Sequence, residues 1–116
     1  MNYKNVILLG GSGFVGRHLA VELAQRGFQV TIPCRRPQQL NALRVLSNIT
    51  LRQANIMNPG ELSSLCKGHD VVINLVGILN ESKKTSFRKI HIDFIKTMVQ
   101  ACQNNGIKRL LHISAL

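Results

Sequence analysis

The sequence has few aromatic and few acidic residues. It contains no Trp, one Tyr and four Phe, and its 5 Asp and Glu stand against 15 Lys and Arg, which gives a formal net charge of +10. So few aromatic side chains leave little for stacking on nucleic-acid bases. The basic residues occur singly or in pairs, without the long runs typical of nucleic-acid-binding arms. Charge-driven binding of nucleic acid is therefore less favoured than the two functions considered at the end of this section. The positive charge nevertheless suits phosphate-rich ligands in general.

Patterns for disulfides, metals and membranes are also lacking. The cysteines are Cys34, Cys66 and Cys102, and their odd number and wide spacing suit neither a disulfide framework nor a zinc site. The amino end shows no secretory signal, and no apolar run is long enough to span a bilayer. We therefore expect reduced thiols, no metal and no membrane span, which favours a cytoplasmic location.

What the chain does have is the composition of one folded domain. It is 116 residues long, 45% hydrophobic and 17% charged, which allows a single domain over 1–116 and excludes a cofactor domain followed by a separate substrate domain. Strands are expected at 5–9, 28–32, 49–53, 70–76 and 109–114, of which the first is buried on both faces and the third is more polar. Helices are expected at 14–26, 37–46, from Asn58 to the glycine at 68, and at 87–105. Asn58 is expected to cap the third helix, with Glu61 reaching back as in a capping box.

The order β-α-β-α-β-α-β-α-β with short connections predicts the fold class. Such alternation gives right-handed crossovers and strands that all run the same way. The sequence therefore predicts an α/β fold, a Rossmann-type doubly wound parallel sheet with helices on both faces.

A glycine-rich loop joins the first strand to the first helix. Gly10, Gly13 and Gly16 are spaced three apart, directly after a buried strand and at the opening of an amphipathic helix, which is the context that a dinucleotide-binding loop requires. Gly10 would permit the tight turn, Gly13 the close approach of a diphosphate and Gly16 the close packing of the helix. The alternative is a loop that only shapes a turn. No Gly-Lys-Ser/Thr ending is present, so this is not a loop for nucleoside triphosphates.

The end of the second strand bears on which dinucleotide is bound. NAD-binding proteins usually place an acid there to bond the ribose hydroxyls, whereas this strand is followed by Arg35 and Arg36. An acid would repel a 2′-phosphate, and a guanidinium can bind one with two hydrogen bonds. We expect a preference for NADP(H) over NAD(H) through one or both arginines. The alternative is that both arginines are merely solvated.

The same segments resemble a known family. The glycine spacing together with Val71–Gly77 (VVINLVG) and Lys108–Leu116 (KRLLHISAL) resembles the extended and atypical short-chain dehydrogenase/reductases, which include NAD-dependent epimerases and dehydratases. Within that family, NLVGIL followed by HISAL is most similar to bacterial relatives of the dehydrogenase-like accessory subunit of respiratory complex I. The resemblance covers essentially the whole chain and corresponds to the amino-terminal part of such proteins, so it implies a Rossmann domain truncated after its fifth strand.

The resemblance implies a set of cofactor contacts. Asn55 and Ile56 match the Asp-hydrophobic pair that holds the adenine, with Asn in place of Asp. The remaining implied contacts lie in three segments. The diphosphate loop contains Gly10, Ser12, Gly13, Phe14, Val15 and Gly16, the segment under the ribose contains Leu75, Val76 and Gly77, and the strand end toward the nicotinamide contains Ile113 and Ser114.

The family's catalytic residues have no match in this sequence. Members that catalyse use a Ser or Thr just beyond the fifth strand and a downstream Tyr-x-x-x-Lys, in which the lysine acidifies a phenol that moves a proton while hydride moves. Leu116 stands at the hydroxyl position, and the one tyrosine is Tyr3. We therefore predict no catalytic residue and no activity for this chain alone.

Two functions remain ahead of nucleic-acid binding. The first is the dinucleotide-binding module of an epimerase-, dehydratase- or reductase-like oxidoreductase. The second is a non-catalytic NAD(P)H-binding protein with a structural or regulatory part, as the resemblance to the complex I accessory subunit implies, which would allow peripheral association with a complex. The fifth strand is expected at an exposed sheet edge, where apolar strands invite pairing, so homo-oligomers are also predicted.

Overall fold

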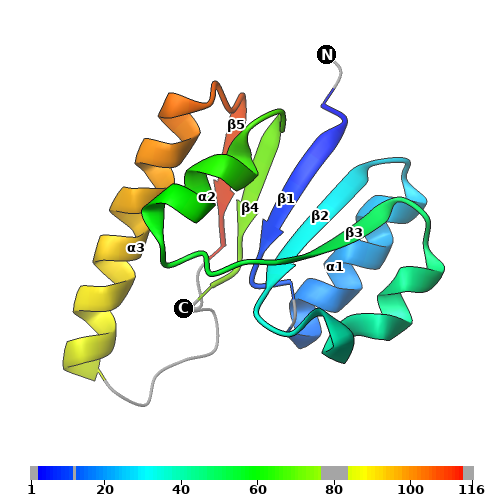
Figure 1. The fold of residues 1–116 in the computed structure, drawn as a ribbon, viewed down its shortest axis with the longest axis horizontal. Coiled ribbons are helices and arrows are strands. Elements are labelled where there is room, and N and C mark those ends of the chain that lie inside the picture. The colour runs from blue at the N-terminus through cyan, green and yellow to red at the C-terminus, as the bar shows by residue number, and fades with distance from the viewer. Residues whose placement is uncertain (1–2, 12, 77–83, 114–116) are drawn as a thin grey trace.

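The structure is a computed structural model that describes residues 3–11, 13–76 and 84–113 (Figure 1). Strands alternate with helices along the chain, as the sequence predicts. The elements are β1 (Asn5–Leu9), α1 (Phe14–Gln25), β2 (Gln29–Cys34), the 3-10 helix η1 (Pro37–Val45), β3 (Ile49–Gln53), α2 (Pro59–Cys66), β4 (Val71–Asn74), α3 (Lys84–Asn104) and β5 (Arg109–His112).

The strands form one parallel sheet in the order β3-β2-β1-β4-β5. The chain moves outward from β1 to β3, then returns to the other side of β1 and moves outward again to β5. The strand order therefore reverses between β1 and β4, which is the switch point where open α/β sheets bind ligands. This arrangement confirms the predicted Rossmann-type fold.

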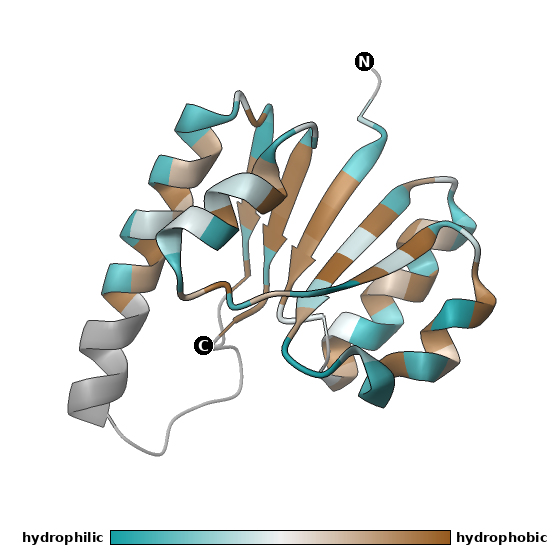
Figure 2. Cartoon of the chain, viewed as in Figure 1, coloured by the Kyte–Doolittle hydropathy of each residue, from teal (hydrophilic) through white to brown (hydrophobic). Residues whose placement is uncertain are grey.

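Alternate residues of the central strands supply two separate apolar layers. Val6 and Leu8 of β1 pack with α1 and η1 on one face, while Ile7 and Leu9 pack with α2 and α3 on the other. Figure 2 shows the mostly brown central strands between helices in which hydrophilic and hydrophobic residues alternate. A sheet buried on both faces requires such continuous apolar runs.

The second helix differs from the prediction of a regular helix over 37–46. It is a 3-10 helix over Pro37–Val45, and Leu40 departs from helical geometry with φ −112° and ψ 22°. Only Leu40 and Leu43 of this segment are buried, and a spacing of three residues matches the 3-10 period. Two short turns that each bury one leucine thus replace a continuous α-helix.

The capping of α2 follows the sequence only in part. The Asn58 side chain accepts a hydrogen bond from the Glu61 N–H at 3.1 Å, as predicted. The expected capping box is wrong, because the Glu61 carboxylate accepts instead from the N–H of Asn55 at 3.1 Å. Glu61 therefore holds the segment after β3 against the start of α2.

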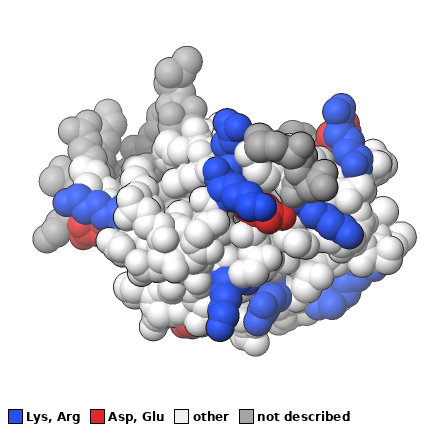
Figure 3. All heavy atoms as spheres, turned by 90° about the horizontal axis from the view of Figure 1, so that it is seen from above, with Lys and Arg blue, Asp and Glu red and all other residues white. Residues whose placement is uncertain are grey.

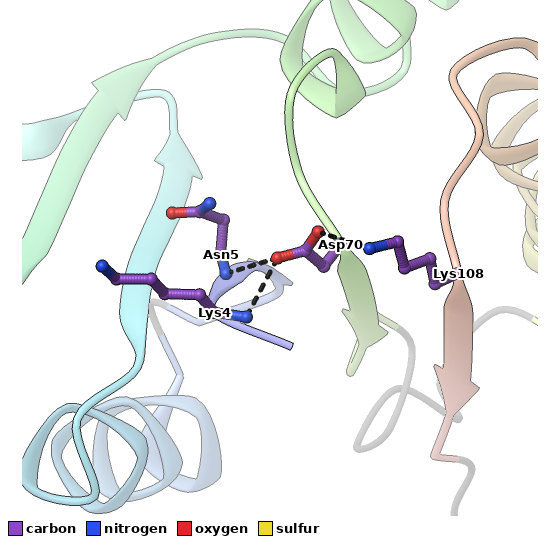
Figure 4. Close-up of polar contacts among 4 residues, drawn as sticks. All are labelled: Lys4, Asn5, Asp70 and Lys108. Carbon is purple, nitrogen blue, oxygen red and sulfur yellow. Dashed lines mark hydrogen bonds and ion pairs between the residues drawn. The ribbon is translucent and has the colours of Figure 1, made fainter. Parts of the chain in front are cut away.

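The amino ends of the strands are joined by one carboxylate (Figure 4). Asp70 Oδ2 accepts hydrogen bonds from the N–H groups of Lys4 and Asn5, both at 2.9 Å, and Asp70 Oδ1 lies 3.7 Å from the Lys108 ammonium. These bonds hold the pKa of Asp70 below its ordinary value, the Asn5 and Lys4 N–H groups contributing most. Asp70 thus connects β1, β4 and β5 at this end of the sheet.

Basic side chains are scattered over this amino-end face (Figure 3). They lie singly or in small groups between uncharged residues, with a few acidic side chains beside them. This distribution agrees with the pairs and single residues of the sequence and differs from the continuous basic stripe expected of a nucleic-acid-binding surface.

Candidate functional site

A cleft of about 500 Å³ opens at the carboxyl ends of the strands. Its walls come from the turn after β1, the end of β2, η1, the loop after β3 and the segment after β4, which places it at the switch point of the sheet. The lining residues are Gly10, Pro33, Cys34, Arg35, Arg36, Gln39, Leu40, Ala54, Asn55, Ile56, Met57 and Val76.

The glycine turn is close-packed at its two ends. Gly10 has φ +82°, and a Cβ there would stand 3.0 Å from the main chain of Leu75 and of Val76. A Cβ on Gly16 would lie 2.5 Å from Gly11 Cα and 2.6 Å from the Gly10 carbonyl oxygen. Both positions require glycine, so α1 can begin in direct contact with the turn.

Gly13 has a different environment from the other two glycines. It is exposed and has extended backbone geometry at the amino end of α1. Among the described residues other than its chain neighbours, a Cβ added there would meet only the Gly10 carbonyl oxygen, at 3.9 Å. The first turn of α1 carries no acidic residue, and Gly13 offers no capping side chain. The amino end of this 12-residue helix therefore favours an anion in the open space before Gly13.

The end of β2 brings positive charge to the cleft. Arg35 and Arg36 are both exposed and both line it, and none of its lining residues within the described ranges 3–11, 13–76 and 84–113 is acidic. Their main chain is held in place: the Gln53 amide donates to the Arg35 carbonyl at 3.3 Å, and the Gln39 N–H donates to the Arg36 carbonyl at 3.0 Å. The guanidinium groups thus stand on a fixed backbone.

Cys34 is half-buried beside these arginines. Burial raises the pKa of its thiol above the ordinary value, and the nearby Arg44 offsets this only in part. The thiol is therefore protonated near neutral pH and adds no negative charge to the cleft.

The loop after β3 is ordered by its own side chains. The Asn55 Oδ1 atom accepts from the Met57 N–H at 3.1 Å, while the Asn55 N–H is bonded to Glu61. The Asn55 oxygen that was expected to accept from an adenine thus already accepts one hydrogen bond from the neighbouring main chain and keeps its second lone pair. Ile56 is half-buried and lines the cleft.

The other predicted residues fall into three groups. Leu75 is buried and Val76 lines the cleft. Phe14 and Val15, at the start of α1, and Ile113, after β5, are exposed by 75%, 42% and 42% and do not line the cleft. Ser12, Gly77 and Ser114 lie outside the described residues.

Sequence reasoning missed two polar residues near the site. Asn74 is fully buried at the end of β4, and its side chain bonds the N–H of Val76 and the ring of His112. A signal was available, because Asn74 interrupts the most hydrophobic strand of the chain.

A parallel sheet with a glycine turn and a basic cleft at its switch point defines a Rossmann-type dinucleotide-binding domain. Residues 10–116 match the model of the NAD(P)H-binding family, and the chain belongs to this family. The match confirms the predicted family and the binding of a nicotinamide dinucleotide as the domain's function.

Relatives of two kinds match nearly the whole chain. Subunit 9 of the NADH dehydrogenase [ubiquinone] 1 alpha subcomplex from Mus musculus is 26% identical over 113 residues, 94% of this chain and 30% of that protein. A UDP-N-acetyl-alpha-D-glucosaminuronate decarboxylase from Bacillus cytotoxicus is 33% identical over 103 residues, 87% of this chain and 31% of that protein. The chain thus spans about a third of the length of these curated relatives.

The fold also matches solved structures. A Rossmann-fold NAD(P)-binding family protein from Shigella flexneri superposes with a TM-score of 0.70 at 21% identity, covering 94% of this chain and 50% of that one. Within the part of the chain that the structure describes, no helix combines the length and the apolar character needed to cross a membrane.

Proposed function

We propose that this domain prefers NADP(H) and that Arg35 and Arg36 bind the 2′-phosphate. The observation that carries the proposal is the pair of exposed guanidinium groups on a fixed backbone, in a cleft with no acid among the lining residues that the structure describes. A 2′-phosphate pairs well with arginine, whereas the ribose hydroxyls of NAD(H) usually pair with an acid after the second strand. Arg35 and Arg36 stand there in this chain.

The rest of the dinucleotide would follow the cleft toward β1. The proposed diphosphate position is at the turn between Gly10 and Gly16 and the amino end of α1, with Ser12, Phe14 and Val15 around it. The adenine would lie beside Asn55 and Ile56. The proposed ribose and nicotinamide contacts are Leu75, Val76, Gly77, Ile113 and Ser114.

Calorimetry with NADPH and NADH tests this preference. We expect NADPH to bind about tenfold or more tightly than NADH, because a charge-assisted bidentate pair contributes on the order of 1.4 kcal/mol or more. Arg35→Glu and Arg36→Glu should reduce the affinity for NADPH and leave that for NADH nearly unchanged. Lys67→Glu is the matched control, since Lys67 is exposed just beyond α2 and does not line the cleft. Equal affinities that neither arginine variant alters would refute the preference.

We propose as a second function a binding protein without catalysis of its own. Tyr3 is the one tyrosine of the sequence, and it lies at the amino end of the sheet, with the Arg109 guanidinium 5.9 Å from its ring centroid. That is the end opposite to the cleft, so Tyr3 is not available as the proton-transferring phenol. Incubation with NAD and a UDP-N-acetylglucosamine uronate should yield no product. Turnover by the purified chain would exclude this function and restore the enzyme hypothesis.

The edge of the sheet supports a proposal about assembly. Among the strands that the structure describes, β5 pairs only with β4, and its Leu111 is 43% exposed. We propose that a second copy pairs along β5, and that association with a larger complex would use the same edge. Light scattering should then give a mass above 12.9 kDa that rises with concentration, whereas a monomer at every concentration would exclude pairing between copies.

Three free cysteines favour a reducing compartment such as the cytoplasm.

A further inference from the structure

Asn74 is the one fully buried polar side chain among the described residues. It ends β4, whose other residues are Val71, Val72 and Ile73, and it stands in register with His112 of β5. A buried carboxamide is unfavourable unless both of its ends form hydrogen bonds. The Asn74 side chain therefore needs hydrogen-bond partners at both its oxygen and its NH₂ group.

Both ends of the carboxamide have such partners. Asn74 Oδ1 accepts from the N–H of Val76 at 3.0 Å, which turns the NH₂ end toward His112 Nδ1 at 2.9 Å. An NH₂ group only donates, so the lone pair of His112 Nδ1 accepts this bond.

The bond to Val76 acts on the wall of the cleft. β4 ends at Asn74, and the Leu75 N–H still donates to the Leu9 carbonyl of β1 at 2.8 Å. The main chain of Leu75 and Val76 then passes so close to Gly10 that a Cβ there would lie 3.0 Å away. Val76 itself lines the cleft. The Val76 N–H is thus held between Asn74 and the glycine turn, where a small displacement would change the shape of the cleft.

We propose that Asn74 and His112 form a positioning pair for the dinucleotide. Asn74 fixes the Leu75–Val76 main chain against the glycine turn, and His112 fixes the orientation of the Asn74 carboxamide. Neither residue needs to touch the cofactor. The proposal rests on the proposed function, because it concerns the same cleft. It adds His112 of β5, a residue that does not line the cleft.

The pair is tested with substitutions of His112 that keep or remove a hydrogen-bond acceptor at the position of Nδ1. His112→Asn places an oxygen where Nδ1 stands, His112→Gln places its amide near Nε2 instead, and His112→Leu has no acceptor. His112 is exposed, so all three variants should fold. We expect His112→Asn to bind NADPH nearly as the native protein does, and the other two about tenfold more weakly, because the Asn74 NH₂ is left unpaired.

Hydrogen exchange without cofactor gives the second measurement. The Val76 amide should exchange slowly in the native protein and in His112→Asn, and at least tenfold faster in His112→Leu, while amides of β1 remain unchanged. Native NADPH affinity in His112→Leu, or unchanged exchange at Val76, would overturn the positioning pair. Absence of NADPH binding to the native protein would instead overturn the proposed function, and the exchange rates would still show whether His112 orders the Val76 segment.

Discussion

The amino and carboxyl ends of the parallel sheet satisfy their polar groups in opposite ways. At the amino end, the Asp70 carboxylate binds two main-chain N–H groups and faces the Lys108 ammonium. At the carboxyl end, α1 begins without a capping side chain, and Arg35 and Arg36 stand exposed in a cleft whose described lining residues include no acid. The chain thus supplies its own anion at one end and leaves positive groups for an external anion at the other.

This difference teaches where substitutions affect stability and where they affect binding. The amino end is complete without a ligand, so changes there should alter folding and leave binding intact. The glycine turn takes part in both, because it packs against α1 and faces the cleft. Three substitutions separate these contributions.

Gly16→Ala should have the largest effect. The new Cβ would stand 2.5 Å from Gly11 Cα and 2.6 Å from the Gly10 carbonyl oxygen, both main-chain atoms, so the turn or α1 must shift. We expect about 2 kcal/mol or more of lost stability in urea unfolding, and an affinity for NADPH reduced about 100-fold. Native stability and affinity together would show that the close packing of the turn is unimportant.

Gly13→Ala should separate binding from folding. Apart from its chain neighbours, its Cβ would meet only one atom of the described residues, at 3.9 Å. The loss of stability should therefore stay below about 1 kcal/mol, the cost of replacing glycine at a helix amino end. The methyl group would occupy the space proposed for the diphosphate, and the affinity for NADPH should fall about tenfold or more. Calorimetry and urea unfolding on the same sample check both parts, and unchanged affinity would place the diphosphate elsewhere.

Asp70→Asn should have the smallest effect and act only on stability. The folded pKa of Asp70 lies below its ordinary value because the charged form accepts the Asn5 and Lys4 N–H groups and faces Lys108. Its stabilisation is therefore present above the unfolded pKa of about 4 and is lost as the pH falls through the lower folded value. Thermal melts of the native protein should show this loss below about pH 4, and Asp70→Asn should lack that part of the pH dependence. NADPH affinity at neutral pH should not change, and a change would contradict the independence of the two ends.

Much of the fold follows from local pattern. The apolar runs of β1 and β4 and the helical period of α1 predicted the order of elements, because each depends on neighbours a few residues away. The glycine spacing and Arg35–Arg36 predicted part of the cleft for the same reason. The arrangement that brings Gly10, Arg36 and Val76 to one cleft follows from the parallel topology.

The contacts that were missed depend on distant residues. The bond between Asn74 and His112 joins side chains 38 residues apart and exists only because β4 and β5 pair in one register. Glu61 follows a capping pattern in sequence but reaches Asn55, since the loop after β3 runs beside α2. The spacing of apolar residues predicts neither of these hydrogen-bond partners. The 3-10 geometry of η1 likewise depends on a tertiary contact, the burial of Leu40 and Leu43.

The position of β1 has a consequence for how the domain opens. This strand is central in the sheet, and its successive side chains belong alternately to the two apolar layers. Loss of η1 or α3 would expose one layer only, whereas loss of β1 removes the common wall of both. Local openings can therefore release either outer half while β1 stays protected, so that its amides exchange with solvent only through global unfolding.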